Sequence, residues 1–254
     1  MKSLILSTLM IGTAALGTGA LGMSQATAKD AAKNIVLVHG AFADATSWDK
    51  VSAILGAKGY KVTAVRIPLT SLADDVAATR AAIDAQDGPT ILVGHSWGGV
   101  VIGEAGSSEK VKALVYVAAF APNKGETLNA LLKSAPPTEG LKAIHPDDKG
   151  FLSIDVAAFP TVFAADVPRT EAEVMARHQI PFNSVGFSTP VEVAAWSNKP
   201  SFYVVTTEDQ MLAPAAQKFF SGRMKAKVTE IAASHAGAVS KAGDVARVIE
   251  EATR

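Results

Sequence analysis

The hydrophobic pattern of this chain alternates between short apolar runs and longer stretches in which apolar residues recur at helical spacing. Short, β-branched runs are typical of parallel strands that are buried on both faces. Predicted strands cover residues 34–38, 60–65, 90–93, 111–119, 201–206 and 228–231. Predicted helices cover residues 47–55, 72–85 and 241–253. This alternation predicts an α/β fold with a doubly wound, mostly parallel sheet.

The alternation breaks down between Pro122 and Pro200. Seven further prolines lie between these two, and only short amphipathic pieces such as residues 171–178 remain. A long insertion at the carboxyl ends of parallel strands usually covers an active site. Residues from about 122 to 199 are therefore predicted to form a cap insertion.

The first 28 residues differ from the rest of the chain. Lys2 gives a positive start, residues 4–22 are apolar and small, and residues 26–28 read Ala-Thr-Ala before Lys29. This pattern predicts a secretory signal peptide over residues 1–28, followed by one domain over residues 29–254. The alternative is an uncleaved membrane anchor, which the many small residues disfavour. We expect an exported protein, periplasmic or secreted, with no stable membrane association after cleavage.

Composition narrows the class further. With 254 residues and 48% hydrophobic residues, the chain can bury a full core as one large α/β domain. The formal net charge is +0 and basic residues are spread along the sequence, so no nucleic-acid partner is expected. The chain has no cysteine, which excludes disulfides and leaves stability to the core. The oligomeric state stays open.

The clearest chemical motif is Gly-His-Ser-Trp-Gly at residues 94–98. It follows the apolar run at residues 90–93 and precedes a small, helix-compatible segment. Such a sharp strand-to-helix turn lifts the hydroxyl of Ser96 clear of the sheet and needs glycine where a Cβ would collide. The motif predicts a nucleophile elbow with Ser96 as the nucleophile.

A serine nucleophile needs a histidine base, and the histidine needs an acid that orients it. In this fold the acid follows the elbow and the histidine comes last. His235 lies just after the last predicted strand, and is the histidine expected at that place. For the acid, Asp209 is preferred over Glu208 because a loop to the next helix follows it. The catalytic prediction is Ser96, Asp209 and His235.

The oxyanion hole and the substrate pocket complete the predicted site. Backbone N–H groups of Ala41, after the first strand, and of Trp97, in the elbow, are predicted to hold the oxyanion. Phe42 is predicted to line the pocket, and apolar walls from the cap are predicted at Phe151, Phe159, Phe163 and Phe182. This chemistry requires no metal or cofactor, and we expect none.

Over essentially its whole mature length, the chain resembles the α/β-hydrolase superfamily. The resemblance is carried by residues 36–41, 59–65, 92–99, 115–122, 207–209 and 234–235. It is strongest toward the capped branch that includes plant salicylate-type methylesterases and hydroxynitrile lyases. The resemblance implies a bacterial, exported esterase of the α/β-hydrolase fold, and it implies the same catalytic and oxyanion-hole residues.

Two positions depart from the lyases. They carry a threonine after the first-strand histidine and a lysine after the catalytic histidine, where this chain has Gly40 and Ala236. Both differences disfavour cyanohydrin cleavage. We therefore expect a serine hydrolase for small-molecule carboxylic esters with an apolar acyl or alcohol part. The alternatives are a lactonase or another C–O or C–C hydrolase with the same triad, or a non-catalytic ligand-binding protein on this fold.

Overall fold

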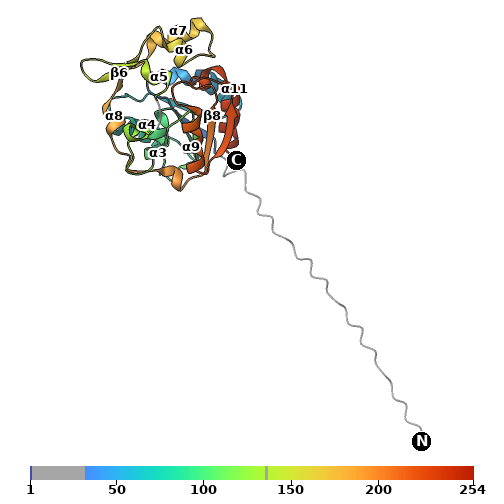
Figure 1. Ribbon diagram of the computed structural model, residues 1–254. Coiled ribbons are helices and arrows are strands. Elements are labelled where there is room, and N and C mark those ends of the chain that lie inside the picture. The colour runs from blue at the N-terminus through green and yellow to red at the C-terminus, as the bar shows by residue number, and fades with distance from the viewer. Residues whose placement is uncertain (2–31, 135–136) are drawn as a thin grey trace. The chain divides into compact units, whose positions relative to one another are not determined.

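The computed structural model describes residue 1, residues 32–134 and residues 137–254 (Figure 1). The predicted signal peptide, residues 1–28, lies outside the described residues apart from Met1. No helix in the described ranges is both long and apolar enough to cross a membrane.

A parallel sheet runs through the domain in the strand order β2-β1-β3-β4-β8-β9. Its strands are β1 (Asn34–Val38), β2 (Lys61–Val65), β3 (Thr90–His95), β4 (Val111–Val117), β8 (Ser201–Thr206) and β9 (Lys227–Ile231). The chain runs from β1 outward to β2 and then returns past β1 to β3. The strand order therefore reverses between β1 and β3, and ligands of doubly wound sheets bind at such a switch point.

Helices cover both faces of this sheet. On one face lie η1 (Ala45–Trp48), α1 (Asp49–Ala57), α10 (Gly237–Ser240) and α11 (Ala242–Glu251). On the other lie α2 (Leu72–Asp84), α3 (Gly98–Ala105) and α9 (Pro214–Arg223). Strand β1 is wholly apolar from Ile35 to Val38 because both of its faces are buried. Ile35 and Leu37 pack into one apolar core, while Val36 and Val38 pack into the other. The predicted doubly wound α/β fold is confirmed.

Residues 122–199, named the inserted segment below, connect β4 to β8. They contain α4 (Leu128–Lys133), α5 (Glu139–Lys142), β5 (Ile144–Pro146), β6 (Phe151–Ile154), α6 (Phe159–Val162), α7 (Arg169–His178), β7 (Phe182–Asn183), α8 (Val185–Ser188) and η2 (Ala195–Ser197). Strands β5, β6 and β7 form a small antiparallel sheet that the sequence pattern did not indicate. In Figure 1, α5, α6, α7 and β6 gather at the top of the domain.

Element boundaries differ from the predictions at a few places. Strand β4 ends at Val117 rather than residue 119, because Ala118 adopts a left-handed backbone with φ 45°. The closing helix, predicted over residues 241–253, is α11, which ends two residues earlier, and the short α10 precedes it. Ser71 caps the N-terminus of α2, since its Oγ accepts from the backbone N–H of Asp74 at 3.1 Å.

Candidate active site

Ser96 lies on the tight turn between β3 and α3. Its backbone is left-handed, with φ 52°, a strained conformation for a residue with a side chain. A Cβ at Gly94 would collide with the backbone of Gly98, and a Cβ at Gly98 would collide with the carbonyl of Val38. The turn is held by the backbone N–H of Ser96, which donates to Val117 O at 3.2 Å. Local sterics thus explain both glycines of the motif.

Ser96 opens into a small apolar cavity of about 30 Å³, which has room for only two or three water molecules. The cavity is lined by Ala41, Phe42, Ser96, Trp97, Phe120, Leu132, Leu141, Ile144, Phe187, Met211, Leu212 and His235. Ser96 and His235 thus face the same space. Within the described residues no hydrogen bond joins the Ser96 hydroxyl to His235, and such bonds are often long before a substrate binds.

His235 and Asp209 form a buried pair. His235 lies in the loop between β9 and α10, and its Nδ1 donates to Asp209 Oδ2 at 2.7 Å. Both side chains are at most 2% exposed. With Nδ1 carrying the proton, Nε2 of the neutral ring has a free lone pair that can accept a proton.

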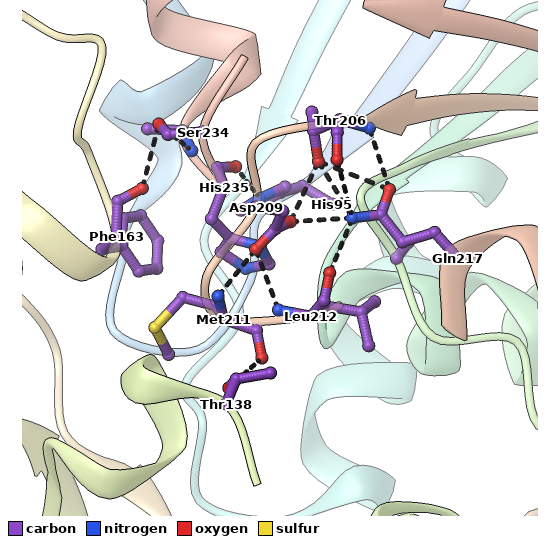
Figure 2. A network of polar contacts seen from close by, with 12 residues as sticks. His95, Thr138, Phe163, Thr206, Asp209, Met211, Leu212, Gln217, Ser234 and His235 are labelled. Carbon is purple, nitrogen blue, oxygen red and sulfur yellow. Dashed lines mark hydrogen bonds and ion pairs between the residues drawn. The ribbon is translucent and has the colours of Figure 1, made fainter. Parts of the chain in front are cut away.

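The carboxylate of Asp209 is held by four further donors, all drawn in Figure 2. Its Oδ1 accepts from the backbone N–H groups of Met211 at 2.8 Å and Leu212 at 2.9 Å. Its Oδ2 accepts from Thr206 Oγ1 and Gln217 Nε2, each at 2.9 Å. A buried carboxylate with its oxygens satisfied in this way stays oriented toward the histidine. Glu208, the alternative acid, is exposed.

His95 contacts the loop that carries His235. Its Nε2 lies 2.9 Å from the carbonyl oxygen of His235, and the two rings have centroids 4.7 Å apart. Because a carbonyl only accepts, His95 carries its proton on Nε2. Burial first, and then the repulsion that a protonated His235 would exert, hold the pKa of His95 well below its usual range. His95 is therefore a neutral residue that fixes the backbone at His235.

The loop after β1 approaches Ser96 closely. A Cβ at Gly40 would lie 2.8 Å from Ser96 Cβ, so only glycine fits there. His39 fixes this loop: Ile67 N–H donates to its Nε2 at 3.2 Å, so its Nδ1 donates to Gly40 O at 2.9 Å. Burial lowers the pKa of His39, which keeps the ring neutral.

Two backbone N–H groups beside Ser96 lack partners. In the described part of the chain, neither the N–H of Ala41 nor that of Trp97 donates a hydrogen bond. Both residues line the Ser96 cavity, and the N–H of Trp97 stands at the start of α3, where the helix dipole favours negative charge. These are the two donors that the sequence predicted for an oxyanion hole.

The indole of Trp97 is fixed by a buried carboxylate, that of Asp75 in the first turn of α2. Asp75 Oδ2 accepts from Trp97 Nε1 at 2.7 Å, and its Oδ1 accepts from Leu69 N–H at 2.8 Å. Asp75 is fully buried, and burial raises its pKa from near 3.8 to about 6 against these two hydrogen bonds. The spacing of Asp75 from Trp97 gave no signal for this contact.

The inserted segment forms hydrogen bonds with both loops that carry Asp209 and His235. Thr138 Oγ1 donates to Met211 O at 3.0 Å, next to the acid. On the histidine loop, Ala236 N–H donates to Phe163 O at 3.0 Å, and the Ser234 hydroxyl lies 3.2 Å from the same oxygen (Figure 2). The position of His235 therefore depends on the inserted segment as well as on the sheet.

The predicted pocket phenylalanines divide into two groups. Phe42 lines the Ser96 cavity, and Phe42 and Phe159 line a second cleft beside it. Phe151, Phe163 and Phe182 are absent from both linings. Phe151 lies on β6, Phe163 packs its ring edge-on against His235 at 4.9 Å, and Phe182 packs behind Trp97 at 4.8 Å. Phe163 and Phe182 thus pack behind lining residues instead of lining the cavity, and Phe151 lies outside both linings.

Several lining residues were not foreseen. From the inserted segment they are Leu132, Leu141, Ile144 and Phe187, and from loops after the strands they are Phe120, Met211 and Leu212. The residues after the strands could have been found, because they follow β4 and the acid directly in the chain. The direction of side chains in the irregular inserted segment has no such signal.

Comparisons with known proteins agree with this architecture. The model of the Alpha/beta hydrolase family matches residues 35–248. A pyrethroid hydrolase of Sphingobium wenxiniae is 29% identical over 233 residues, which cover 80% of this chain and 81% of that protein. Methylesterase 7 of Arabidopsis thaliana is 37% identical over 112 residues, or 37% of this chain and 43% of that protein.

The same similarity appears in three dimensions. The crystal structure of a pyrethroid hydrolase from Sphingobium faniae matches with a TM-score of 0.77 and 26% identity, covering 87% of this chain and 97% of that one. The family match, the structural match and the methylesterase relative confirm the predicted fold class, the predicted resemblance and the prediction of a hydrolase. The chain belongs to the alpha/beta hydrolase family.

Proposed function

We propose that this protein hydrolyses carboxylic esters through Ser96, His235 and Asp209. One observation carries the proposal: a strained serine and an Asp-bound histidine line the same cavity as two unpartnered backbone N–H groups. Nucleophile, base, orienting acid and oxyanion donors are the parts that acyl transfer needs.

The first half of the reaction forms an acyl-enzyme. Ser96 Oγ attacks the ester carbonyl while His235 Nε2 takes the hydroxyl proton. The carbonyl oxygen becomes an oxyanion, which the N–H groups of Ala41 and Trp97 stabilise. The C–O bond to the alcohol then breaks, and His235 gives its proton to the departing oxygen. Asp209 stabilises the imidazolium and keeps it oriented throughout.

The second half repeats these steps with water. His235 takes a proton from a water molecule, whose oxygen attacks the acyl carbon and again creates an oxyanion between the two N–H groups. Collapse breaks the bond to Ser96 Oγ, which recovers its proton from His235. The products are a carboxylic acid and the free enzyme.

The substrate is proposed to have an apolar part next to Ser96. Apart from His235, every residue that lines the Ser96 cavity lacks an ionisable side chain, so a charged group would lose its hydration there without a partner. The names of two relatives, a pyrethroid hydrolase and a carbendazim hydrolyzing esterase, support a small, neutral substrate. Gly40 and Ala236 remain unfavourable for lyase chemistry.

The test is covalent labelling of Ser96 combined with ester hydrolysis. A fluorophosphonate probe is expected to label the wild-type protein once, and Ser96→Ala is expected to remove the label and lower kcat/KM for p-nitrophenyl butyrate by roughly 10⁶-fold. Ser107→Ala, at a residue outside the Ser96 cavity, serves as the control and is expected to keep both. Labelling that survives Ser96→Ala would contradict the assignment, and a lactone panel tests the alternative substrate class.

We also propose that the protein is exported and cleaved after Ala28. The support is the sequence pattern alone: a positive start, an apolar stretch and Ala-Thr-Ala at residues 26–28. Mass spectrometry of the protein from its native host is expected to find an N-terminus at Lys29. An intact form that starts at Met1 in the cytoplasm would contradict export.

A further inference from the structure

A second cleft, about ten times larger than the Ser96 cavity, lies on the other side of Phe42. Its volume is about 310 Å³, within the range of sites that hold small molecules. The core side of the cleft comes from the residues after β1 and from Val239. The other side comes from α6 and α7, through Phe159, Glu171, Val174, Met175 and His178. The cleft therefore lies between the sheet domain and the inserted segment.

Among the residues that the structure describes, Phe42 alone belongs to the linings of both spaces. It follows Ala41, is 4% exposed, and has a left-handed backbone with φ 63°. Such conformations are costly for a bulky residue and cluster at ligand clamps and switch regions. The ring of Phe42 contacts Phe182 edge-on at 6.4 Å and separates the cleft from Ser96.

The Ser96 cavity is too small for a whole ester. Its 30 Å³ and the 40 Å³ of a neighbouring apolar cavity that shares Phe120, Leu132, Leu141, Met211 and Leu212 leave space for a compact apolar group only. The larger part of a substrate needs another compartment that begins within reach of Ser96. The cleft beyond Phe42 is the candidate, because it shares that residue with the Ser96 cavity.

The charges in the cleft narrow the ligand class. Its lining carries three carboxylates, Asp44, Asp49 and Glu171, and one lysine. That lysine, Lys50, is paired with Glu171 at 2.8 Å across the cleft. An anionic group would therefore meet a wall of net negative charge, whereas a neutral or cationic group would not.

We propose that the cleft beyond Phe42 is a second substrate compartment, and that Phe42 is the specificity-determining partition between it and Ser96. The inference rests on the proposed ester hydrolysis. The substrate is an ester with one compact apolar part beside Ser96 and one larger, neutral or cationic part in the cleft.

Filling the cleft tests the compartment. Met175→Trp and the more exposed Val174→Trp narrow it, and Val156→Trp, on an exposed residue of the inserted segment outside the cleft, is the matched control. Hydrolysis of ethyl acetate, 2-naphthylmethyl acetate and ethyl 2-naphthylacetate is followed by acid release. Both filling variants are expected to lower kcat/KM for one naphthyl ester at least tenfold relative to ethyl acetate.

The naphthyl ester that responds identifies whether the alcohol or the acyl part occupies the cleft. Phe42→Ala is expected to raise kcat/KM for that same ester relative to ethyl acetate, because the partition is removed. Val156→Trp is expected to leave all ratios unchanged. Ratios within twofold of wild type for both filling variants and for Phe42→Ala would overturn the proposal.

A binding measurement separates this inference from the proposed chemistry. In the Ser96→Ala protein, 2-naphthalenemethanol and 2-naphthylmethylammonium are expected to bind at least tenfold more tightly than 2-naphthoate, and Met175→Trp is expected to abolish their binding. Hydrolysis by the wild type without binding of either probe would overturn the compartment alone. Binding without any ester hydrolysis by the wild type would overturn the function alone.

Two glutamates of α7, Glu171 in the cleft and Glu173 outside it, test the predicted charge selectivity. Glu171→Gln removes a carboxylate from the cleft and leaves Lys50 without its partner, so the affinity for 2-naphthoate is expected to rise at least threefold. Glu173→Gln, at a residue paired with Arg169 outside the cleft, is expected to leave it unchanged. An equal response of the two variants would overturn the predicted charge selectivity.

Discussion

The sheet side and the inserted segment contribute to the Ser96 cavity in different ways. The lining residues from the sheet side, among them Ser96, Trp97 and His235, are all buried. Those from the inserted segment are all half-buried: Leu132, Leu141, Ile144 and Phe187. The reacting groups thus lie on a rigid, buried scaffold, whereas the apolar lid of the cavity lies on short, partly exposed elements.

This difference predicts that the sheet side determines activity and stability, whereas the inserted segment determines substrate preference. Changes on the sheet side are expected to lower the hydrolysis of every ester or the stability of the fold, because polar networks and close backbone contacts have no alternative arrangement there. Changes in the inserted segment are expected to alter which ester is preferred.

After the loss of Ser96 itself, the largest effect is expected from the acid. Asp209→Asn removes the carboxylate that fixes the proton on His235 Nδ1, so kcat/KM is expected to fall roughly 10⁴-fold for short and long esters alike. Glu208→Gln, at the exposed neighbour, is the control and is expected to change kcat/KM less than about twofold. Steady-state kinetics on a p-nitrophenyl ester series measures both, and a larger loss in Glu208→Gln would reassign the acid.

The next effect concerns the elbow. Gly98→Ala places a Cβ against the carbonyl of Val38, so the free energy of unfolding is expected to fall by about 3 kcal/mol. Gly56→Ala in α1 is the control, since a Cβ there has no neighbour within 4 Å and alanine favours a helix by about 0.5–1 kcal/mol. Urea denaturation measures both, and equal stabilities of the two variants would contradict the steric account.

The elbow was predictable because its steric demand is local. Gly94, Ser96 and Gly98 follow a buried strand directly, and chain order then led to Asp209 and His235. Asp75 shows the limit of such reasoning. Asp74 and Asp75 both satisfy the helix dipole in the first turn of α2. Helical spacing places Asp75 on the apolar face of Leu72 and Val76, but nothing in the sequence indicates Trp97 as its partner.

The inserted segment was predictable only as a whole. Its proline content and lost periodicity indicated a separate covering, but its small antiparallel sheet and the direction of its side chains depend on contacts far along the chain. Phe163 and Phe182 turn toward His235 and Trp97, while Phe187 faces the cavity. All three are equally apolar, so hydrophobicity alone does not rank them.

Phe187 provides the test of the inserted segment. Phe187→Ala enlarges the small cavity at Ser96 and is expected to raise the kcat/KM ratio of octanoate to acetate p-nitrophenyl esters about tenfold. Labelling of Ser96 is expected to persist. Phe219→Ala, at an exposed phenylalanine on α9, is the control and is expected to keep the wild-type ratio. Equal ratios in the two variants would mean that other residues limit the chain length.

The smallest effect is a pH dependence on the sheet side. Asp75 has a folded-state pKa raised to about 6, so the folded protein holds the Asp75 proton more tightly than the unfolded chain. Its contribution therefore favours folding at low pH and is lost as pH rises toward and past 6. Between pH 5 and pH 7 the wild type is expected to lose roughly 1 kcal/mol of stability relative to Asp75→Asn.

Asp74 offers a matched control for this pH effect. Hydrogen bonds from Ser71 and Thr70 lower the pKa of the exposed Asp74, so its stability contribution is lost only as pH falls below its ordinary pKa near 3.8. Asp74→Asn is therefore expected to follow the wild type between pH 5 and pH 7. Urea denaturation at the two pH values measures all three proteins. If Asp75→Asn also runs parallel to the wild type, folding does not raise the pKa of Asp75, and burial beside Trp97 does not penalise its carboxylate.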